Sequence, residues 1–447
     1  MTFKDEMAAY RAANPQVAEA EVFVIDLNGM ARGKLVPIAA LEKLADGKMK
    51  LPSSTPGLDI FSEDVYAAGL AVQTGDPDGP LDAVPGTLGT MLWADQPTAQ
   101  VQVTIRLPDG GIAPFDPRNT LARVVERAAS SGLRPVMALE QEFFLIDPSE
   151  PMPPLNPVTG ERLVMGQVYD LDVGRAFAPV LAEIAEASQA LGAKTEALVT
   201  EFGYGQFEVN LYHGDDPMAA ADQVVALRRA IRGVARKHSM DATFMAKPYG
   251  DTTGSGLHLH LSLWDADGNN IFAGEDAPDA AMAHAIAGCL ERMADTMLIF
   301  APHLNSYRRF IPNSLAPAEA HWAVDHRGVA VRVPETSGAG ARLEHRVAGA
   351  DANPYLVVAA ILAAALDGIE READLPPAVS GELAPGMGGA LPLEWRLAEE
   401  RFAASGFIAD WLGRDVQHVY AAMKRQERER LLAKVTDVEL DLYLRRA

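Results

Sequence analysis

The sequence predicts a two-domain protein that contains both helices and strands, with a small β-rich N-terminal domain and a larger domain with long helices. Near the N-terminus, the apolar segments 21–26 and 32–36 flank the turn signal Asn28-Gly29, which is typical of a β-hairpin. Beyond residue 110, long segments of helical character alternate with strand-like segments. We therefore expect the N-terminal domain to cover residues 1–110 and the larger domain to cover residues 111–447.

The remaining elements of the N-terminal domain are short. Residues 1–15 predict a polar helix before the hairpin, and residues 39–44 predict a second helix. The segment 48–117 is rich in Pro, Gly and Asp, which favour turns, and contains short expected strands at 91–94 and 101–106.

In the larger domain, helices are expected at 117–130, 175–191, 219–238, 280–298, 354–371 and 415–432, and strands at 135–146, 196–211, 257–263 and 342–347. A Gly-x-Gly turn divides the segment 196–211 into two strands. The Pro-rich segment 148–166 predicts a surface loop, and loops dominate 302–341. There are no internal repeats.

The composition restricts the function class. The chain has 447 residues, and its 39 basic and 61 acidic residues give a net charge of −22, which disfavours nucleic acid or an anionic membrane as the main partner. The single cysteine, Cys289, excludes an intramolecular disulfide, and its apolar helical surroundings predict a buried thiol. Without a signal peptide or an apolar run of membrane-spanning length, we expect a soluble cytoplasmic protein.

A glycine-rich turn followed by an alternating strand is the first candidate for chemistry. Glycines between Gly250 and Gly256 allow close approach of the backbone to a ligand, and their N–H groups suit anionic oxygens. In the strand that follows, His258, His260 and Ser262 alternate with leucines and therefore share one face. A strand with its polar face in water explains the same pattern.

Carboxylates gather on two further segments. Glu140 and Glu142 lie two residues apart in an apolar strand, so they share a face, where their charges repel unless a cation lies between them. Glu201 and Glu208 flank the hairpin turn Gly203-Tyr204-Gly205, which can bring their strands together.

The segment 342–346 (RLEHR) places Arg342, Glu344 and Arg346 on one face of a strand. Carboxylates with one imidazole suit Mg²⁺ or Mn²⁺, and arginines bind phosphate or carboxylate in a bidentate manner. Together these segments indicate a metal–phosphate site, although each alone is also explained by a surface strand. The sequence lacks the P-loop motif GxxxxGK[ST] and the GxSxG nucleophile elbow, which disfavours a Walker-type ATPase and a serine hydrolase.

Five segments, in this order, resemble the glutamine synthetase superfamily: EQEFFLID, FGYGQFEVN, KPYGDTTGSGLHLH, NSYRRFIPN and RLEHRVAGADANPYL. The resemblance covers essentially the whole chain. QVYDLD, FEVNLYH and RVAGADANPYLVVAA resemble the γ-glutamylpolyamine (γ-glutamylputrescine) synthetase branch. The resemblance implies an α+β fold, with an N-terminal β-grasp domain and a catalytic domain whose antiparallel sheet is flanked by helices. It also implies a dodecamer of two hexameric rings, with active sites shared between subunits.

The same resemblance implies roles for individual residues. Glu142, Glu201 and Glu208 would hold one divalent ion, and Glu140, His258 and Glu344 would hold a second. Gly254, Arg309 and Arg332 would bind glutamate or its activated γ-phosphate, while Arg327 and Arg342 would face the ATP phosphates. Arg309, Arg327 and Arg332 are the expected catalytic arginines, and Glu196, His213 and Ser262 match nucleotide-side positions. For His260 we expect a structural role near the site.

Two departures from ammonia-using members concern the nucleophile. Leu51 and Leu315 stand where those members carry an Asp and a Glu that bind ammonium, and Thr253 stands where they carry an Asn. Leucine cannot pair with a small hydrated cation, but it gives an alkyl chain apolar contact worth about 0.8 kcal/mol per buried methylene. Leu51 and Leu315 are therefore expected to contact a larger amine.

The expected reaction is ATP-dependent ligation of the γ-carboxylate of L-glutamate to a primary amine, such as putrescine or another alkylamine, through γ-glutamyl phosphate. The expected cofactors are ATP and two or more Mg²⁺ or Mn²⁺ ions per site. Three alternatives are glutamine synthesis with ammonium, ligation of a monoamine or ethanolamine, and a non-catalytic paralogue. The complete carboxylate and arginine sets argue against the last of these.

Overall fold

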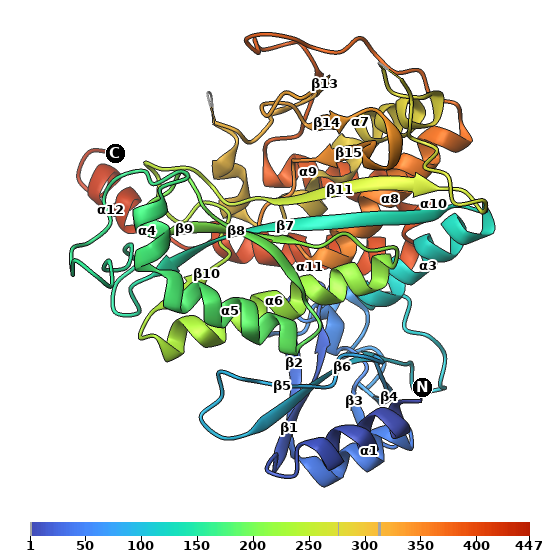
Figure 1. The fold of residues 1–447 in the computed structure, drawn as a ribbon, viewed down its shortest axis with the longest axis vertical. Coiled ribbons are helices and arrows are strands. Elements are labelled where there is room, and N and C mark those ends of the chain that lie inside the picture. Colours follow the sequence, from blue (N-terminus) through green and yellow to red (C-terminus); the bar gives the residue numbers. More distant parts are fainter. Residues whose placement is uncertain (1, 276, 312–313) are drawn as a thin grey trace.

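The computed structural model describes residues 2–275, 277–311 and 314–447. The N-terminal part contains a six-stranded sheet in the order β2-β1-β6-β4-β3, with β5 paired to β6 (Figure 1). Its strands are β1 (Glu19–Ile25), β2 (Ala31–Pro37), β3 (Lys50–Pro52), β4 (Asp78–Ala83), β5 (Gly89–Thr90) and β6 (Thr98–Ile105). β1 runs parallel to β6, and the other pairs are antiparallel. The helices α1 (Phe3–Ala13) and α2 (Leu41–Ala45) complete this part.

The predicted hairpin 21–36 is confirmed, whereas the strand predicted at 91–94 is wrong. β5 ends at Thr90, and the amide of Ala94 donates to the carbonyl of Met91 at 3.1 Å, so the chain turns here. Apolar Met91, Leu92 and Trp93 resemble a strand, but the Asp, Gln and Pro that follow favour a turn. The domain boundary near residue 110 stays a prediction.

The second sheet has eight strands in the order β13-β14-β15-β11-β7-β9-β8, with β10 paired to β7. Its strands are β7 (Arg134–Ile146), β8 (Thr195–Thr200), β9 (Gln206–Leu211), β10 (Asp241–Thr243), β11 (Leu257–Trp264), β13 (Trp322–Val324), β14 (Val331–Glu335) and β15 (Arg342–His345). All pairs are antiparallel except β13–β14. A separate two-stranded sheet joins β12 (Glu319–Ala320) to β16 (Gly389–Ala390).

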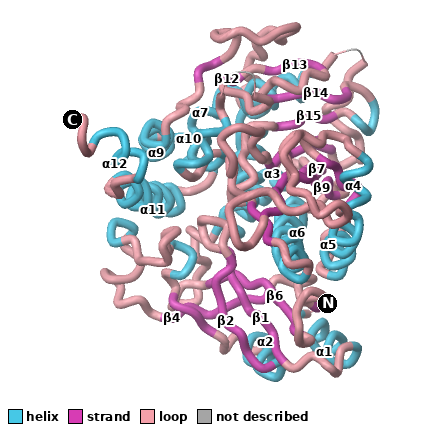
Figure 2. The backbone as a smooth tube through the Cα atoms, turned by 90° about the vertical axis from the view of Figure 1, so that its left-hand side faces the viewer, coloured by secondary structure: helices cyan, strands magenta, loops and turns pink. Residues whose placement is uncertain are grey.

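Ten further helices surround this sheet within the described residues: α3 (Pro117–Ser130), α4 (Leu171–Ala176), α5 (Ala178–Ala190), α6 (Pro217–Lys237), α7 (Ala280–Phe300), α8 (Pro354–Glu370), α9 (Trp395–Ala404), α10 (Gly406–Trp411), α11 (Arg414–Leu432) and α12 (Asp437–Tyr443). α5 and α6 lie between the two sheets (Figures 1 and 2). Several helices begin where an Asp or Asn caps the first turn before a proline; for example, Asp116 accepts from the amides of Arg118 and Asn119.

The apolar core follows from these elements. α8 is buried along almost its whole length and packs against α7 and α3, while the leucines of β11 are fully buried behind its polar face. In contrast, α12 contains no buried residue. Among the described residues, no helix is both long and apolar enough to cross a membrane. The α+β fold predicted from the sequence is therefore present, with the polar face of β11 in the middle of the larger sheet.

Candidate active site

One face of the large sheet forms the wall of a cavity of about 1130 Å³. Of the site residues predicted from the sequence, only Leu51 does not line this cavity. The residues that do line it are Glu140, Glu142, Glu196, Glu201, Glu208, His213, Gly254, His258, Ser262, Arg309, Leu315, Arg327, Arg332, Arg342 and Glu344. They come from six strands and from the loops between them. The structure therefore brings together residues from segments that are distant in the sequence.

The register of the sheet explains this convergence. His258 on β11 is directly opposite Glu140 on β7, and Glu142 is directly opposite Glu208 on β9. Because paired residues of neighbouring strands project from the same face, each pair continues the polar surface across one more strand. On the other side of β11, His260 is opposite Glu344 on β15, and Glu344 is opposite Arg332 on β14.

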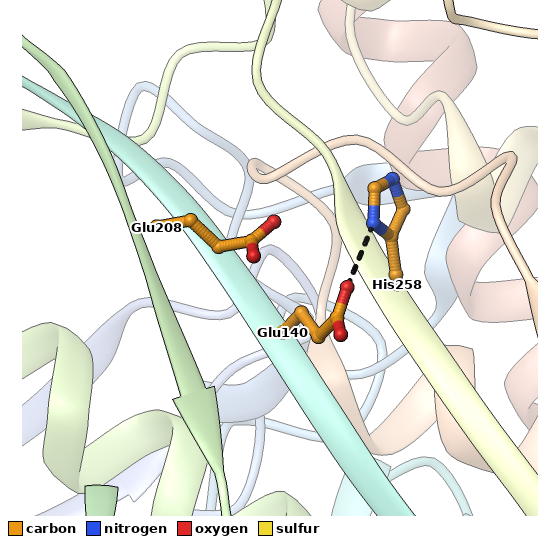
Figure 3. Close-up of side chains that lie close together, drawn as sticks. All are labelled: Glu140, Glu208 and His258. Atoms are coloured by element: carbon orange, nitrogen blue, oxygen red, sulfur yellow. Dashed lines mark hydrogen bonds and ion pairs between the residues drawn. The ribbon is translucent and has the colours of Figure 1, made fainter. Parts of the chain in front are cut away.

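The acidic centre of the cavity contains close contacts between carboxylates and imidazoles. His258 Nδ1 lies 3.2 Å from Glu140 Oε2, and its Nε2 lies 3.9 Å from Glu142 Oε1. Glu140, Glu208 and His258 point toward one another, and each offers a ligand atom within 4.8 Å of the others (Figure 3). Glu142 also accepts hydrogen bonds from the amide of Gly256 at 2.8 Å and from Gln206 Nε2 at 3.1 Å.

The electrostatics of this cluster favour a cation. Burial and then the charge of Glu142 raise the pKa of Glu201 to about 7. Burial and the charges of Glu140 and Glu142 also raise the pKa of Glu208 well above its usual range. Grouped carboxylates with imidazole nitrogen are the donor set expected for Mg²⁺ or Mn²⁺, so the residues present fit such an ion.

A second group of possible ligands consists of Glu140, His260 and Glu344. The first of these groups differs from the predicted sets, because it combines Glu208 with Glu140 and His258, although Glu208 also lies opposite Glu142. The assignment of individual residues to two ions stays a prediction.

His260 makes two hydrogen bonds in this second group. Its Nε2 lies 3.0 Å from Glu140 Oε1, and its Nδ1 accepts a hydrogen bond from Arg342 Nε at 3.3 Å. Both ring nitrogens therefore have protein partners, which is compatible with the structural role expected for this histidine.

Arginines surround the opposite side of the cluster. Arg332 donates to Glu344 at 2.9 Å and to Asp325 at 2.6 Å, and Arg346 forms an ion pair with the other oxygen of Glu344. Burial alone would raise the pKa of Glu344, but the charges of Arg346, His260 and His258 together outweigh burial and lower this pKa to about 2. Glu344 is thus an anion that orients two arginines beside the cavity.

The glycine-rich turn packs directly against Arg309. This arginine is buried and donates to the carbonyl of Val347 at 3.0 Å. A Cβ added to Gly254 would lie 2.6 Å from Arg309 Cγ and 2.5 Å from the carbonyl oxygen of Ala246. Glycine at position 254 is therefore required by close packing of the turn against the side chain that it supports.

Comparison with known proteins decides the family. Residues 114–443 match the family model described as "Glutamine synthetase, catalytic domain". The chain belongs to the glutamine synthetase family. It is therefore an ATP-dependent ligase that joins glutamate to an amine, and family members use ATP and divalent metals.

The relatives of this glutamine synthetase family member are named for reactions with different nitrogen substrates. The chain is 38% identical to the gamma-glutamylputrescine synthetase of Escherichia coli K12, over 100% of this chain and 95% of that protein. It is 32% identical to a glutamine synthetase of Halobacterium salinarum (86% and 87% covered) and 31% identical to a glutamate–isopropylamine ligase of a Pseudomonas species (94% and 93% covered). A solved structure, "GmaS/ADP complex-Conformation 1", superposes with a TM-score of 0.86 at 28% identity, over 99% and 100% of the two chains.

The two leucines expected near the amine lie in different surroundings in this family member. Leu315 lines the cavity, next to the part of the segment 311–315 (Pro312 and Asn313) that lies outside the described residues. Leu51 is only 6% exposed and packs in the hydrophobic core of the N-terminal part, where it pairs with Gly79. Its contact with an amine stays a prediction, because the cavity of the same chain does not include it.

Sequence reasoning missed several residues that line the cavity of the ligase, among them Tyr169, Phe202, Asn210 and Trp264. Asn210 and Trp264 could have been added from their parity with Glu208 and Ser262. Tyr169 and Phe202 gave no such signal, because each lies outside a regular strand.

Proposed function

We propose that this ligase joins the γ-carboxylate of L-glutamate to an aliphatic primary amine at the cavity on the large sheet. The observation that carries the proposal is the single surface on which clustered carboxylates and His258 lie beside Arg309 and Arg332. Such a surface suits a phosphoryl group and a carboxylate that react with each other.

We propose roles for the lining residues as follows. Arg309, Arg332 and Gly254 bind glutamate, and Arg327 and Arg342 face the phosphates of ATP. Glu196, His213 and Ser262 lie on the nucleotide side, where Trp264 Nε1 donates to Ser262 Oγ at 3.0 Å. The carboxylates and His258 hold two or more Mg²⁺ or Mn²⁺ ions, which, when bound, neutralise phosphate charge.

The proposed chemistry has two displacements. An oxygen of the γ-carboxylate of glutamate attacks the γ-phosphorus of ATP, and ADP leaves. The amine nitrogen then attacks the acyl carbon of γ-glutamyl phosphate, the bond to the phosphate oxygen breaks, and a proton leaves the nitrogen. Activation is needed because a free carboxylate is a poor electrophile, and the arginines align and stabilise the anionic groups.

This route predicts the fate of one oxygen atom. If glutamate carries ¹⁸O in its γ-carboxylate, one labelled oxygen is expected in the inorganic phosphate that is released, because that oxygen bridged carbon and phosphorus. Mass spectrometry of the phosphate measures the transfer. Retention of all the label in the amide would rule out the acyl phosphate.

The amine is expected to carry carbon. We predict that kcat/KM for a short alkylamine or diamine is at least about tenfold above that for ammonium, a difference of about 1.4 kcal/mol. Leu315 offers apolar contact in the cavity and has no charge to pair with ammonium. Phosphate release would be measured with ammonium, methylamine, isopropylamine, ethanolamine, putrescine and spermidine. Preference for ammonium over every other amine would favour glutamine synthesis instead.

We also propose that the ligase is a homo-oligomer, with two hexameric rings as the expected form. The exposed side chains of Val435, Val438 and Leu444 support this proposal, because they give the C-terminal segment around α12 apolar surface without a core of its own. Light scattering is expected to give a mass many times the 47.9 kDa of one chain. An active monomer would contradict the proposal.

A further inference from the structure

The segment 166–170 is tied to the hairpin between β8 and β9. The buried side chain of Gln167 donates to the carbonyl of Gln206 at 2.9 Å and accepts from the amide of Gly205 at 3.1 Å. The amide of Tyr169 donates to the carbonyl of Thr200 at 3.0 Å. These bonds hold the segment against the end of β8, beside the start of α4 (Figure 1).

The backbone of Tyr169 is in an unusual conformation. Its φ angle is 57°, in the left-handed region that a bulky residue adopts only when its surroundings require it. The side chain of Asp170 caps α4 by accepting from the amides of Asp172 and Val173, which fixes the chain on the other side of Tyr169. The result is an aromatic side chain that lines the cavity and is still 63% exposed.

A second aromatic side chain lies on the neighbouring segment. Phe202 lines the same cavity, is 46% exposed, and follows Glu201 directly in the sequence. Because both partly exposed aromatic side chains line one cavity, beside the carboxylate of Glu201, they offer apolar surface to a ligand there.

Tyr169 and Phe202 lie near the end of β8 that is opposite to the nucleotide side. Glu196 lies near the start of β8 and Phe202 follows its end, so six residues of extended chain separate them by about 20 Å. Glu201, a proposed metal ligand, lies at the same end as the aromatic pair. The rings are therefore near the proposed chemistry but far from the nucleotide side.

We propose that Tyr169 and Phe202 form the subsite for the hydrocarbon chain of the amine substrate. This inference rests on the proposed ligation of glutamate to an aliphatic amine. The ring faces contact the methylene groups next to the reacting nitrogen, and they also attract the distal ammonium of a diamine. The substrate class is a straight-chain primary amine or diamine of several carbons.

The test is the dependence of kcat/KM on chain length. Methylamine, ethylamine, propylamine, butylamine and putrescine are assayed with saturating ATP and glutamate, by phosphate release and by mass of the product. In the unmodified enzyme, kcat/KM is expected to rise about fourfold per methylene, the factor that corresponds to 0.8 kcal/mol. In Tyr169→Asn and Phe202→Ala the rise is expected to fall below about twofold, whereas Tyr169→Phe retains it.

The variants are chosen so that folding does not obscure the result. Asn tolerates the left-handed backbone at position 169, so Tyr169→Asn removes the ring without adding strain. Tyr66→Ala is the matched control, because Tyr66 is 67% exposed and lies outside the cavity lining. This control is expected to keep the full dependence on chain length.

The outcomes separate the two proposals. An unchanged rise in both Tyr169→Asn and Phe202→Ala would overturn the subsite, as would a higher KM for glutamate with the chain-length dependence intact. If none of the alkylamines tested supports phosphate release by the unmodified enzyme, the proposed function itself fails.

Discussion

Replacing Glu344 by Gln is expected to lower kcat by at least about a hundredfold, the loss typical when one preorganised electrostatic group is removed. The carboxylate is 1% exposed and accepts from both Arg332 and Arg346. A neutral amide cannot balance the buried guanidinium group of Arg346 and the partly buried one of Arg332, so both arginines lose their orientation beside the cavity. Steady-state phosphate release with saturating ATP, glutamate and amine measures the effect.

Glu335→Gln is a suitable control, because Glu335 is exposed on β14 and does not line the cavity. Its activity is expected to stay within about twofold of the unmodified enzyme. Thermal unfolding of both variants shows whether the fold is intact. Full activity of Glu344→Gln, or of the unmodified enzyme in excess chelator, would contradict a metal–phosphate site at this cluster.

Gly254→Ala is expected to lower kcat/KM for glutamate by about a hundredfold, as a misplacement of about 1 Å can do. The new methyl group would meet the carbonyl of Ala246 and the side chain of Arg309 at distances that no stable packing allows. Because the backbone carbonyl cannot yield easily, Arg309 must move away from its place in the cavity wall. The KM for glutamate is the quantity expected to change most.

Gly250→Ala tests the same loop without the collision. No atom lies within 4 Å of a Cβ at position 250, and φ there is not positive. This variant is expected to retain nearly normal kinetics. If Gly254→Ala keeps the KM for glutamate of the unmodified enzyme, Arg309 does not bind this substrate.

Alternation along single strands was readable from the sequence. A period of two places three pairs of side chains on shared faces: Glu140 with Glu142, His258 with Ser262, and Arg342 with Glu344. Two of the helices predicted from the sequence, α3 and α8, begin in the structure directly after a capping residue, Asp116 before Pro117 and Asn353 before Pro354.

What the sequence could not provide is the pairing between strands. No local signal states that Glu142 is opposite Glu208 or that Arg332 is opposite Glu344, because register depends on the whole sheet. The strands β12, β13 and β14 were missed within 302–341, since β12 and β13 are too short to show a period and β14 contains Pro334, which disfavours a strand. The left-handed Tyr169 was also hidden, because hydrogen bonds from distant segments hold it in place.

The direct pairing of site residues across β9, β7, β11, β15 and β14 has a consequence for folding. A shift of one residue between any two of these strands would turn the functional side chains of one strand to the opposite face. The strands also come from distant parts of the chain, and contacts between such segments form slowly because closing long loops costs entropy. In refolding from denaturant, helical circular dichroism should therefore return before catalytic turnover, which only molecules with every strand in register can support.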